Sequence, residues 1–329
     1  MRRAIHIAVQ LRFAAIIVAL IACAHTPQAQ DRSVLSHEIA ELWQDPVDLL
    51  ERDLFYGPGG SAIAPPATDG TFEFLAFKKT GTNPGYDLKD ASGRVWSVKL
   101  GIEAQPEVTT SRILWAMGYH QPPQYFVHQF TLKGGDPGVK STARFRTEID
   151  QWEAAGDWSW YENPFMNAAP FGGLVVAQLI LNNWDLKTPN NRIYQARDGS
   201  TKPQQLFMVR DVGASLGHSK QSPFFKLLGT PGSQGTKNDI DGFEQQGFIK
   251  KVDGDKLTFD YRGLNQALVD RVKVADVIWA CEQMAKIPDG HWQAAFKAGA
   301  FPQEDADRYI RKIKEKIAQG LALKTTATR

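Results

Sequence analysis

The 329-residue chain is poor in cysteine and has little excess of charge of either sign. Its two cysteines, Cys23 and Cys281, exclude a disulfide framework. Cys281 lies in the apolar stretch 275–285, so we expect it to be a buried core thiol. Thirty-eight basic residues against 36 acidic ones give a net charge of +2. This balance argues against a nucleic-acid-binding protein that relies on charge.

Several catalytic motifs are also absent. The sequence has no G-x-S-x-G serine elbow, no H-E-x-x-H and no complete P-loop. The histidines are scattered along the chain, which disfavours a zinc site. With 43% hydrophobic residues, the chain can nevertheless bury a large core, enough for one two-lobed domain or two small ones.

Residues 1–30 have the pattern of an export signal. Three arginines and no acidic residue precede or flank an apolar run at 13–22, which small residues follow. The run is too short to span a bilayer stably. We therefore expect an exported protein that is periplasmic, secreted or lipid-anchored in the envelope. Removing the three arginines of this segment would change the net charge to 35 − 36 = −1.

The segment offers three candidate processing sites, one for a lipoprotein and two for an ordinary signal peptidase. Residues 20–23 resemble a bacterial lipobox, in which Cys23 becomes the lipidated first residue. Residues 27–29 offer an ordinary signal-peptidase site, and residues 22–24 a further one. Contact with a membrane is expected only through a lipid anchor at Cys23.

The first half of the remaining chain is rich in strand signals. Residues 31–70 read as a helical lead-in, over 31–56, and a linker. Alternating patterns at 71–78, 86–89 and 94–100 predict a three-stranded antiparallel meander. A helix is expected over 104–117, closed by Gly118, and a further strand over 125–132. Residues 71–135 thus form a small β lobe with one helix.

Residues 136–329 are expected to form a mainly helical lobe. Residues 136–170 read as irregular, and their three tryptophans either line a groove or pack in the core. An apolar helix is expected over 171–183, a strand pair at 192–195 and 205–209, a long loop over 217–247, and helices from about residue 263. The predicted fold class is α+β with two lobes.

Phosphoryl transfer needs a cation on the phosphates, metal ligands and a positioned base, and the chain offers these in order. Lys99, on the third strand, resembles the strand lysine of protein kinases, which reaches the phosphates. Glu107, on the following helix, is placed to pair with this lysine, and Glu103 is the alternative.

The segment from Asp185 to Asn190 resembles the protein-kinase catalytic loop in its Asp-Leu-Lys-x-x-Asn spacing. The resemblance implies that Asp185 orients or deprotonates the attacking hydroxyl and that Lys187 steadies the transferred phosphate. It also implies that Asn190 binds a metal, with Asn191 as the alternative. Asn183 and Trp184 replace the usual His-Arg pair.

Asp211, directly after the strand at 205–209 and followed by Val-Gly, resembles the aspartate of the D-F-G motif, a Mg²⁺ ligand. The loop at 79–85 lies where a phosphate-covering loop belongs, but it is not G-x-G-x-x-G. Gly81 and Gly85 could offer backbone N–H groups to phosphates, and a plain hairpin loop is the alternative.

Taken in order, these elements resemble the protein-kinase-like superfamily over residues 71–217, nearest its atypical lipid-kinase-like and bacterial toxin-kinase-like branches. They also resemble a family of exported bacterial proteins with the same Leu-Asn-Asn-Trp-Asp-Leu-Lys segment. The resemblance implies an envelope phosphotransferase that uses ATP and Mg²⁺. A non-catalytic pseudokinase-like binding module is the alternative. The acceptor, a protein hydroxyl, a lipid or a small molecule, stays open.

Overall fold

The computed structural model describes residues 39–60, 63–78, 84–219 and 235–327. The predicted export signal with Cys23, and Gly81 of the predicted phosphate-covering loop, lie outside the described residues. Within the described residues, no helix combines the length and the apolar character needed to cross a membrane.

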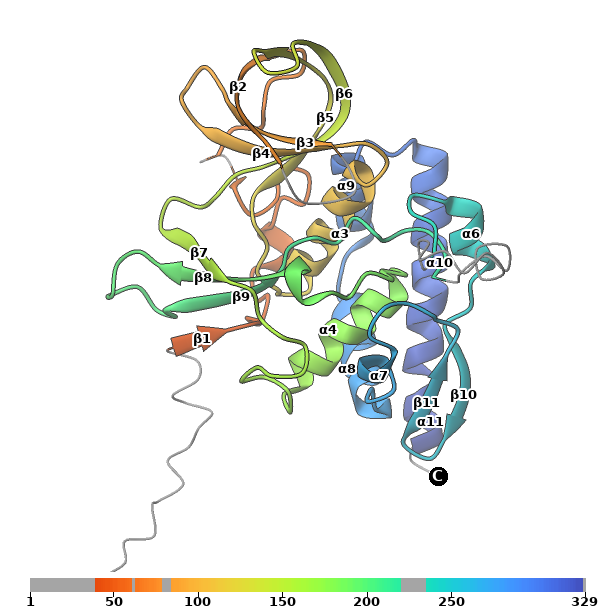
Figure 1. The fold of residues 1–329 in the computed structure, drawn as a ribbon. Helices are drawn as coiled ribbons and strands as arrows, with labels where there is room; N and C mark the ends of the chain where they lie inside the picture. The colour runs from red at the N-terminus through yellow and green to blue at the C-terminus, as the bar shows by residue number, and fades with distance from the viewer. Residues whose placement is uncertain (1–38, 61–62, 79–83, 220–234, 328–329) are drawn as a thin grey trace, which may run out of the picture. The chain divides into compact units, whose positions relative to one another are not determined.

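Five strands close into a small barrel (Figure 1). Their order around the barrel is β2-β3-β4-β6-β5, and all neighbours are antiparallel except β2 and β5. The inward residues form a separate aromatic core that includes Trp96, Phe130 and Phe145. The strands are β2 (Thr71–Phe77), β3 (Gly85–Lys89), β4 (Val95–Leu100), β5 (Gln124–Lys133) and β6 (Gly138–Arg146). The predicted three-stranded meander is confirmed as β2-β3-β4.

Helix α3 (Ala104–Ala116) connects β4 to β5, as predicted. Gly118 follows the C-cap residue Met117, and its φ of +100° favours glycine. A Cβ at this position would lie 2.2 Å from the carbonyl oxygen of Gln44, so a side chain would also displace the N-terminal segment. Polar residues of α3 are buried with the apolar ones, and two of them, Glu107 and Arg112, carry charge.

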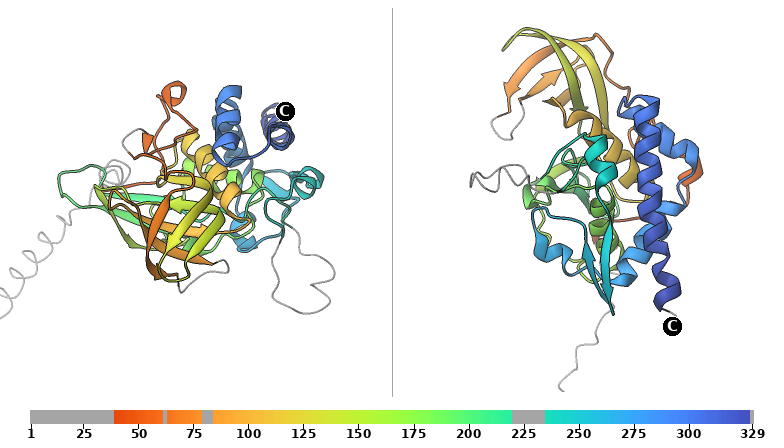
Figure 2. Two further views of the ribbon diagram at one scale, coloured as in Figure 1. Left: turned by 90° about the horizontal axis from the view of Figure 1, so that it is seen from above. Right: turned by 90° about the vertical axis from the view of Figure 1, so that its right-hand side faces the viewer.

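The second lobe combines a four-stranded sheet with helices. The sheet order is β1-β9-β8-β7, with β1 parallel to β9. Helix α10 packs against α6, α8 and α9 (Figure 2). The sheet strands are β1 (Ala40–Glu41), β7 (Trp152–Gly156), β8 (Asn191–Ala196) and β9 (Gln205–Val209), and a hairpin is formed by β10 (Ile249–Asp253) and β11 (Lys256–Phe259). The helices are η1 (Leu49–Glu51), α4 (Ala169–Ile180), η3 (Thr188–Asn190), α6 (Ile240–Gln245), α7 (Gln266–Val269), α8 (Val274–Ala285), α9 (Asp289–Ala298), α10 (Gln303–Leu321) and α11 (Leu323–Ala327).

The structure confirms the predicted α+β class, with a small, mainly antiparallel β lobe carrying one helix and then a mainly helical lobe. Cys281 is a buried free thiol, as expected. The tryptophans of 136–170, namely Trp152, Trp158 and Trp160, are buried, so they pack in cores rather than line a groove.

Two local predictions were wrong. The described part of the expected helix over 31–56 holds only β1 and η1. Pro46 disfavours a helical conformation at Asp45, and the segment instead binds the end of α3, where Gln44 N–H donates to Gly118 O (3.0 Å). Residues 136–170, expected to be irregular, contain β6 and β7. The barrel therefore continues past residue 135 to Arg146.

Candidate active site

A cleft of about 510 Å³ receives side chains from the barrel, from α3 and from the loops around β8 and β9. Six of the eight predicted site residues line it: Gly85, Lys99, Asp185, Lys187, Asn190 and Asp211. Glu107 is fully buried directly behind Lys99. Gly81 lies outside the described residues. The fold thus brings together residues that are more than 100 positions apart in the sequence.

Lys99 is the centre of the charged network. Its position near the end of β4 places its Nζ 2.6 Å from Glu103, 3.2 Å from Glu107 and 2.9 and 3.0 Å from the two carboxylate oxygens of Asp211. Burial alone would lower the pKa of Lys99, but the three carboxylates outweigh burial and raise that pKa above its ordinary value. The ammonium is therefore charged at every physiological pH.

Glu107 is shared among three cations. Its Oε2 accepts from Lys99, while its Oε1 lies 2.8 Å from Arg144 Nε and 3.4 Å from Arg146 Nη1. The two arginines reach the same carboxylate because they are two positions apart on β6 and so point to the same face. The sequence analysis missed both, although the Arg-Phe-Arg alternation at the end of a strand was the available signal.

The sequence analysis gave Glu103 as the alternative to Glu107, and in the structure both carboxylates form ion pairs with Lys99. Glu103 also forms an ion pair with Lys237 of the second lobe. Burial opposes ionisation of Glu103, but the two ammonium groups outweigh it and hold its pKa below the ordinary value. Glu103 therefore links the lysine site to the second lobe.

Asp211 and Asn190 are joined through the backbone. The N–H groups of Arg210 and Asp211 both donate to the carbonyl oxygen of Asn190, at 2.8 and 3.1 Å. This contact ties the end of β9 to the short helix η3. Burial would raise the pKa of Asp211, but Lys99 outweighs burial and holds that pKa well below its ordinary value.

The loop with Asp185 is held by local hydrogen bonds. Asn190 Nδ2 donates to the carbonyl oxygen of Asp185 (2.6 Å), and Asp185 N–H donates to Asn183 Oδ1 (3.2 Å). Lys187 lies 2.8 Å from the Asp185 carboxylate. Asn191, the alternative metal ligand, is buried and donates to Trp158 O (3.0 Å). Asn190, not Asn191, therefore lines the cleft.

The cleft offers the oxygen donors that Mg²⁺ prefers. Carboxylate oxygens of Glu103, Glu107 and Asp211 lie within 4.8 Å of one another. Asn190 uses its amide nitrogen in the bond to Asp185, so its Oδ1 remains as a further potential ligand. The residues present fit a divalent cation, and Glu103, Asn190 and Asp211 are the candidate ligands that line the cleft.

Gly85 begins β3 opposite Lys99. A Cβ at Gly85 would lie 2.8 Å from the carbonyl oxygen of Val98, so glycine allows the close approach of β3 to β4 beneath the cleft.

Trp184 and Lys237 connect the Asp185 loop to the first turn of α3. The Trp184 indole donates to Thr236 O (2.8 Å), and the Lys237 ammonium lies 5.3 Å from the Trp184 ring. The same ammonium pairs with Glu103, and Asn238 donates to Gln105 (3.0 Å). The Trp184 indole N–H and ring thus bind Thr236 and Lys237 of the second lobe.

Replacing Lys237 with methionine is expected to lower the free energy of unfolding by about 1 kcal/mol. The change removes an ion pair with a buried carboxylate and a cation–π contact, while Glu103 keeps Lys99 as a partner. Urea unfolding measures the loss. Lys251→Met, at a side chain that is 68% exposed, is the control and should cost less than about 0.5 kcal/mol. Equal losses in both variants would contradict the contact described for Lys237.

No family model matches the sequence, and no curated protein matches it. Solved structures do match. The proinflammatory kinase CtkA of Helicobacter pylori has a TM-score of 0.46 at 13% identity, covering 78% of this chain and 98% of its own. A Golgi casein kinase with Mn/ADP bound has a TM-score of 0.40 at 9% identity, covering 95% and 89%. The Rio2 kinase of Chaetomium thermophilum, in an ADP/Mg²⁺-phosphoaspartate complex, has a TM-score of 0.31 at 13% identity, covering 75% and 72%.

These are similarities of fold. Since the identities are 9–13% and the TM-scores 0.31–0.46, conclusions about chemistry rest on the cleft residues themselves. In the described residues a small β lobe with one helix precedes a mainly helical lobe, and Lys99, Asp185 and Asp211 line one cleft.

Proposed function

We propose that the protein is an exported, kinase-like phosphotransferase that moves a phosphoryl group from Mg·ATP to a hydroxyl group. The main support is one observation: Lys99, Asp185, Asn190 and Asp211 line a single cleft, and the backbones of Asn190 and Asp211 are hydrogen-bonded. This set supplies the cation, the base and the oxygen ligands that phosphoryl transfer needs.

Each residue has a distinct task in this proposal. Lys99, held by Glu103 and Glu107, binds phosphate oxygens of the donor. Asp211 and Asn190 hold Mg²⁺, which when bound neutralises charge on the phosphates. Asp185 accepts the proton of the acceptor hydroxyl as the oxygen bonds to the γ-phosphorus and the bond to the β-phosphate oxygen breaks. Lys187, which reaches the Asp185 carboxylate, steadies the transferred group.

The place of action and the acceptor are also proposals. The arginines and apolar run of residues 1–30 support export, either as a soluble protein or as one anchored by a lipid on Cys23. The cleft is polar and half open, which suits a hydroxyl on a protein, a lipid or a small molecule.

Replacing Asp185 with asparagine is expected to slow phosphoryl transfer at least about 100-fold, because the base is lost while the side-chain volume is kept. Labelled ATP with Mg²⁺ or Mn²⁺ measures self-labelling and phosphate release under single-turnover conditions. Asp253→Asn, at a carboxylate whose side chain is 75% exposed, is the matched control. No transfer by the unmodified protein with either metal, or equal transfer by the two variants, would contradict the proposal.

A binding module without catalysis is the second candidate, and one observation favours it. Lys99 and Asp211 bind each other through both carboxylate oxygens, so each is satisfied without a ligand. A thermal-shift scan separates the two functions. Stabilisation by Mg·ATP supports the phosphotransferase, whereas stabilisation by a peptide or glycan but not by Mg·ATP supports the module.

A further inference from the structure

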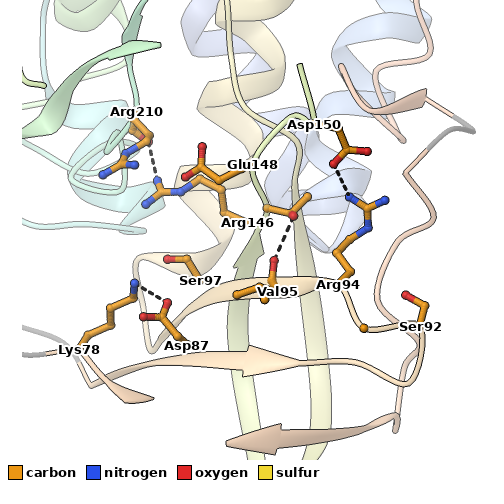
Figure 3. Close-up of a pocket in the computed structure, with 12 residues that line it drawn as sticks. Lys78, Asp87, Ser92, Arg94, Val95, Ser97, Arg146, Glu148, Asp150 and Arg210 are labelled. Carbon is orange, nitrogen blue, oxygen red and sulfur yellow. Dashed lines mark hydrogen bonds and ion pairs between the residues drawn. The ribbon is translucent and has the colours of Figure 1, made fainter. Parts of the chain in front are cut away.

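A second cavity, of about 560 Å³, opens beside the active cleft (Figure 3). It lies against β3, β4 and the chain that leaves β6. The two cavities share four lining residues: Lys78, Ser97, Arg146 and Arg210. A ligand bound at Lys99 can therefore extend past this junction into the second cavity.

The second cavity is poorly suited to a nucleotide base. None of its described lining residues is aromatic, and Val95 is the only one with a large aliphatic side chain. Sites for small organic ligands are lined mainly by apolar and aromatic groups, which cover the faces of a ring. Charged side chains dominate here, including Asp87, Arg94 and Arg146. A purine ring would gain little contact energy in this cavity.

Arg210, at the junction, stands apart from the other cations of the two cavities. Among the described residues, each of the others has a carboxylate within 4.0 Å, whereas the only side-chain contact of Arg210 is the Tyr194 hydroxyl at 3.5 Å. The paired cations are Lys78, Arg94, Lys99, Arg144, Arg146, Lys187 and Arg192. Arg210 is thus the cation of the two cavities that, within the described ranges, has no carboxylate in direct contact, although the charges of Glu148 and Asp211 act on it at longer range.

Arg146 adds positive charge at the same point. Its guanidinium donates to the carbonyl oxygen of Arg210 (3.3 Å; Figure 3). The same guanidinium shares the Glu107 carboxylate (3.4 Å) with Lys99 and Arg144. One carboxylate therefore serves three cations. Glu148 lies in the same cavity, but no ion pair joins it to Arg210 within the described parts of the chain. Glu148 and Asp211 act on Arg210, and Asp211 on Arg146, only through longer-range attraction, so the two neighbouring guanidinium groups keep donors for a phosphate group.

We propose that Arg210 and Arg146 bind a phosphate at the junction of the two cavities and that the ligand of the whole cleft is a linear chain of phosphates. ATP is then recognised through its triphosphate, with little contribution from the base, and an inorganic polyphosphate chain continues into the second cavity. This inference rests on the proposed function in one respect, the binding of phosphates at Lys99.

Isothermal titration at constant Mg²⁺ and salt tests this proposal on the full chain. The probes are ATP, adenosine, sodium tripolyphosphate and a longer polyphosphate. Tripolyphosphate is expected to bind with a dissociation constant within about threefold of that of ATP, and adenosine is expected not to bind. The longer chain should bind at least about tenfold more tightly than tripolyphosphate, because it gains one charge-assisted contact.

Arg210→Gln is expected to remove most of the gain from the longer chain while changing ATP affinity less than about threefold. Tyr194→Phe is the matched control, because it removes the hydroxyl contact of Arg210 and keeps the guanidinium. Arg311→Gln, at a side chain that is 60% exposed on α10, controls for unspecific attraction of polyanions and should leave every affinity unchanged.

The outcomes separate this inference from the proposed function. ATP binding that depends on Lys99, with tripolyphosphate at least tenfold weaker, would overturn the inference and leave the phosphotransferase standing. Polyphosphate binding that Arg210→Gln and Arg311→Gln weaken equally would also overturn it. Polyphosphate binding that depends on Arg210, without transfer of any phosphoryl group, would support the inference and count against the phosphotransferase.

Discussion

If the proposed function holds, replacing Asp211 with asparagine is expected to lower the rate of phosphoryl transfer about 1,000-fold or more, because it removes the charged ligand of the proposed Mg²⁺ site. Asparagine keeps the side-chain volume and can still accept a hydrogen bond from Lys99, so the fold should survive. The local charge changes, however. Glu103 and Glu107 would remain against Lys99 and its neighbouring cations, and this excess of positive charge would disfavour a metal. Single-turnover transfer from labelled ATP over a range of Mg²⁺ concentrations measures the effect.

The same variant should change how stability responds to acid. Lys99 holds the folded-state pKa of Asp211 below its ordinary value despite burial. The carboxylate therefore contributes stability above the unfolded-state pKa of about 3.9, and this contribution is lost as the pH falls through the folded-state pKa. Urea unfolding at pH 6 and at pH 3 should show a smaller difference between the two proteins at the lower pH. A difference that grows on acidification, or full transfer activity in the variant, would contradict the role given to Asp211.

The sequence predicted those parts of the site that depend on short spacings. Asp185 and Asn190 belong to one turn, in which the side chain of Asn190 reaches the backbone of Asp185, so their relation is local. Asp211 follows directly from a strand whose alternating pattern is clear. Lys99 and Glu107 are separated by one strand end and one helical turn. Such features need no knowledge of distant contacts.

Contacts between distant segments could not be predicted in this way. Arg144 and Arg146 reach Glu107 only because β6 closes the barrel. The polar composition of β6 obscures the pattern that would predict a strand. Lys237 reaches Glu103 across 134 positions of sequence. Arg210 was visible in the motif, but its lack of a carboxylate partner depends on the arrangement of every other cation in the two cavities.

The N-terminal segment shows a related limit. Its apolar residues have helical spacing, yet tertiary contacts with α3 determine its conformation. The Trp43 indole donates to Met117 O (2.6 Å), and Arg52 donates to Trp115 O. Because isolated helices of this length are marginal, such contacts outweigh local propensity.

Replacing Lys99 with methionine is expected to lower the free energy of unfolding by about 2 kcal/mol when no divalent cation is present. Removing one partner of a fully buried ion pair costs about 3–5 kcal/mol. Two features reduce the cost here. The Asp211 side chain is 38% exposed, and Glu103 and Glu107 keep Lys237 and Arg144 as partners. Urea unfolding in EDTA measures the loss, and Lys140→Met, whose partner Asp136 is 60% exposed, is the control and should cost clearly less, because solvent screens that ion pair.

The loss in the Lys99 variant should be reversed by metal, since the three carboxylate groups that surround the ammonium could each offer a ligand atom to a cation. At the proposed metal site, Mg²⁺ or Mn²⁺ would bind the folded state, so either ion should stabilise Lys99→Met by about 1–2 kcal/mol at saturating concentration, and the unmodified protein by less, because there the ammonium competes. The difference in free energy of unfolding between the variant and the unmodified protein should also become smaller as the pH falls from 8 to 4. Carboxylates left without the ammonium take up protons in the folded state of the variant. Equal stabilisation of both proteins by metal would show that Glu103, Glu107 and Asp211 do not act as one site. A higher free energy of unfolding in the variant than in the unmodified protein, measured without metal, would show that the ion pairs of Lys99 do not stabilise the fold.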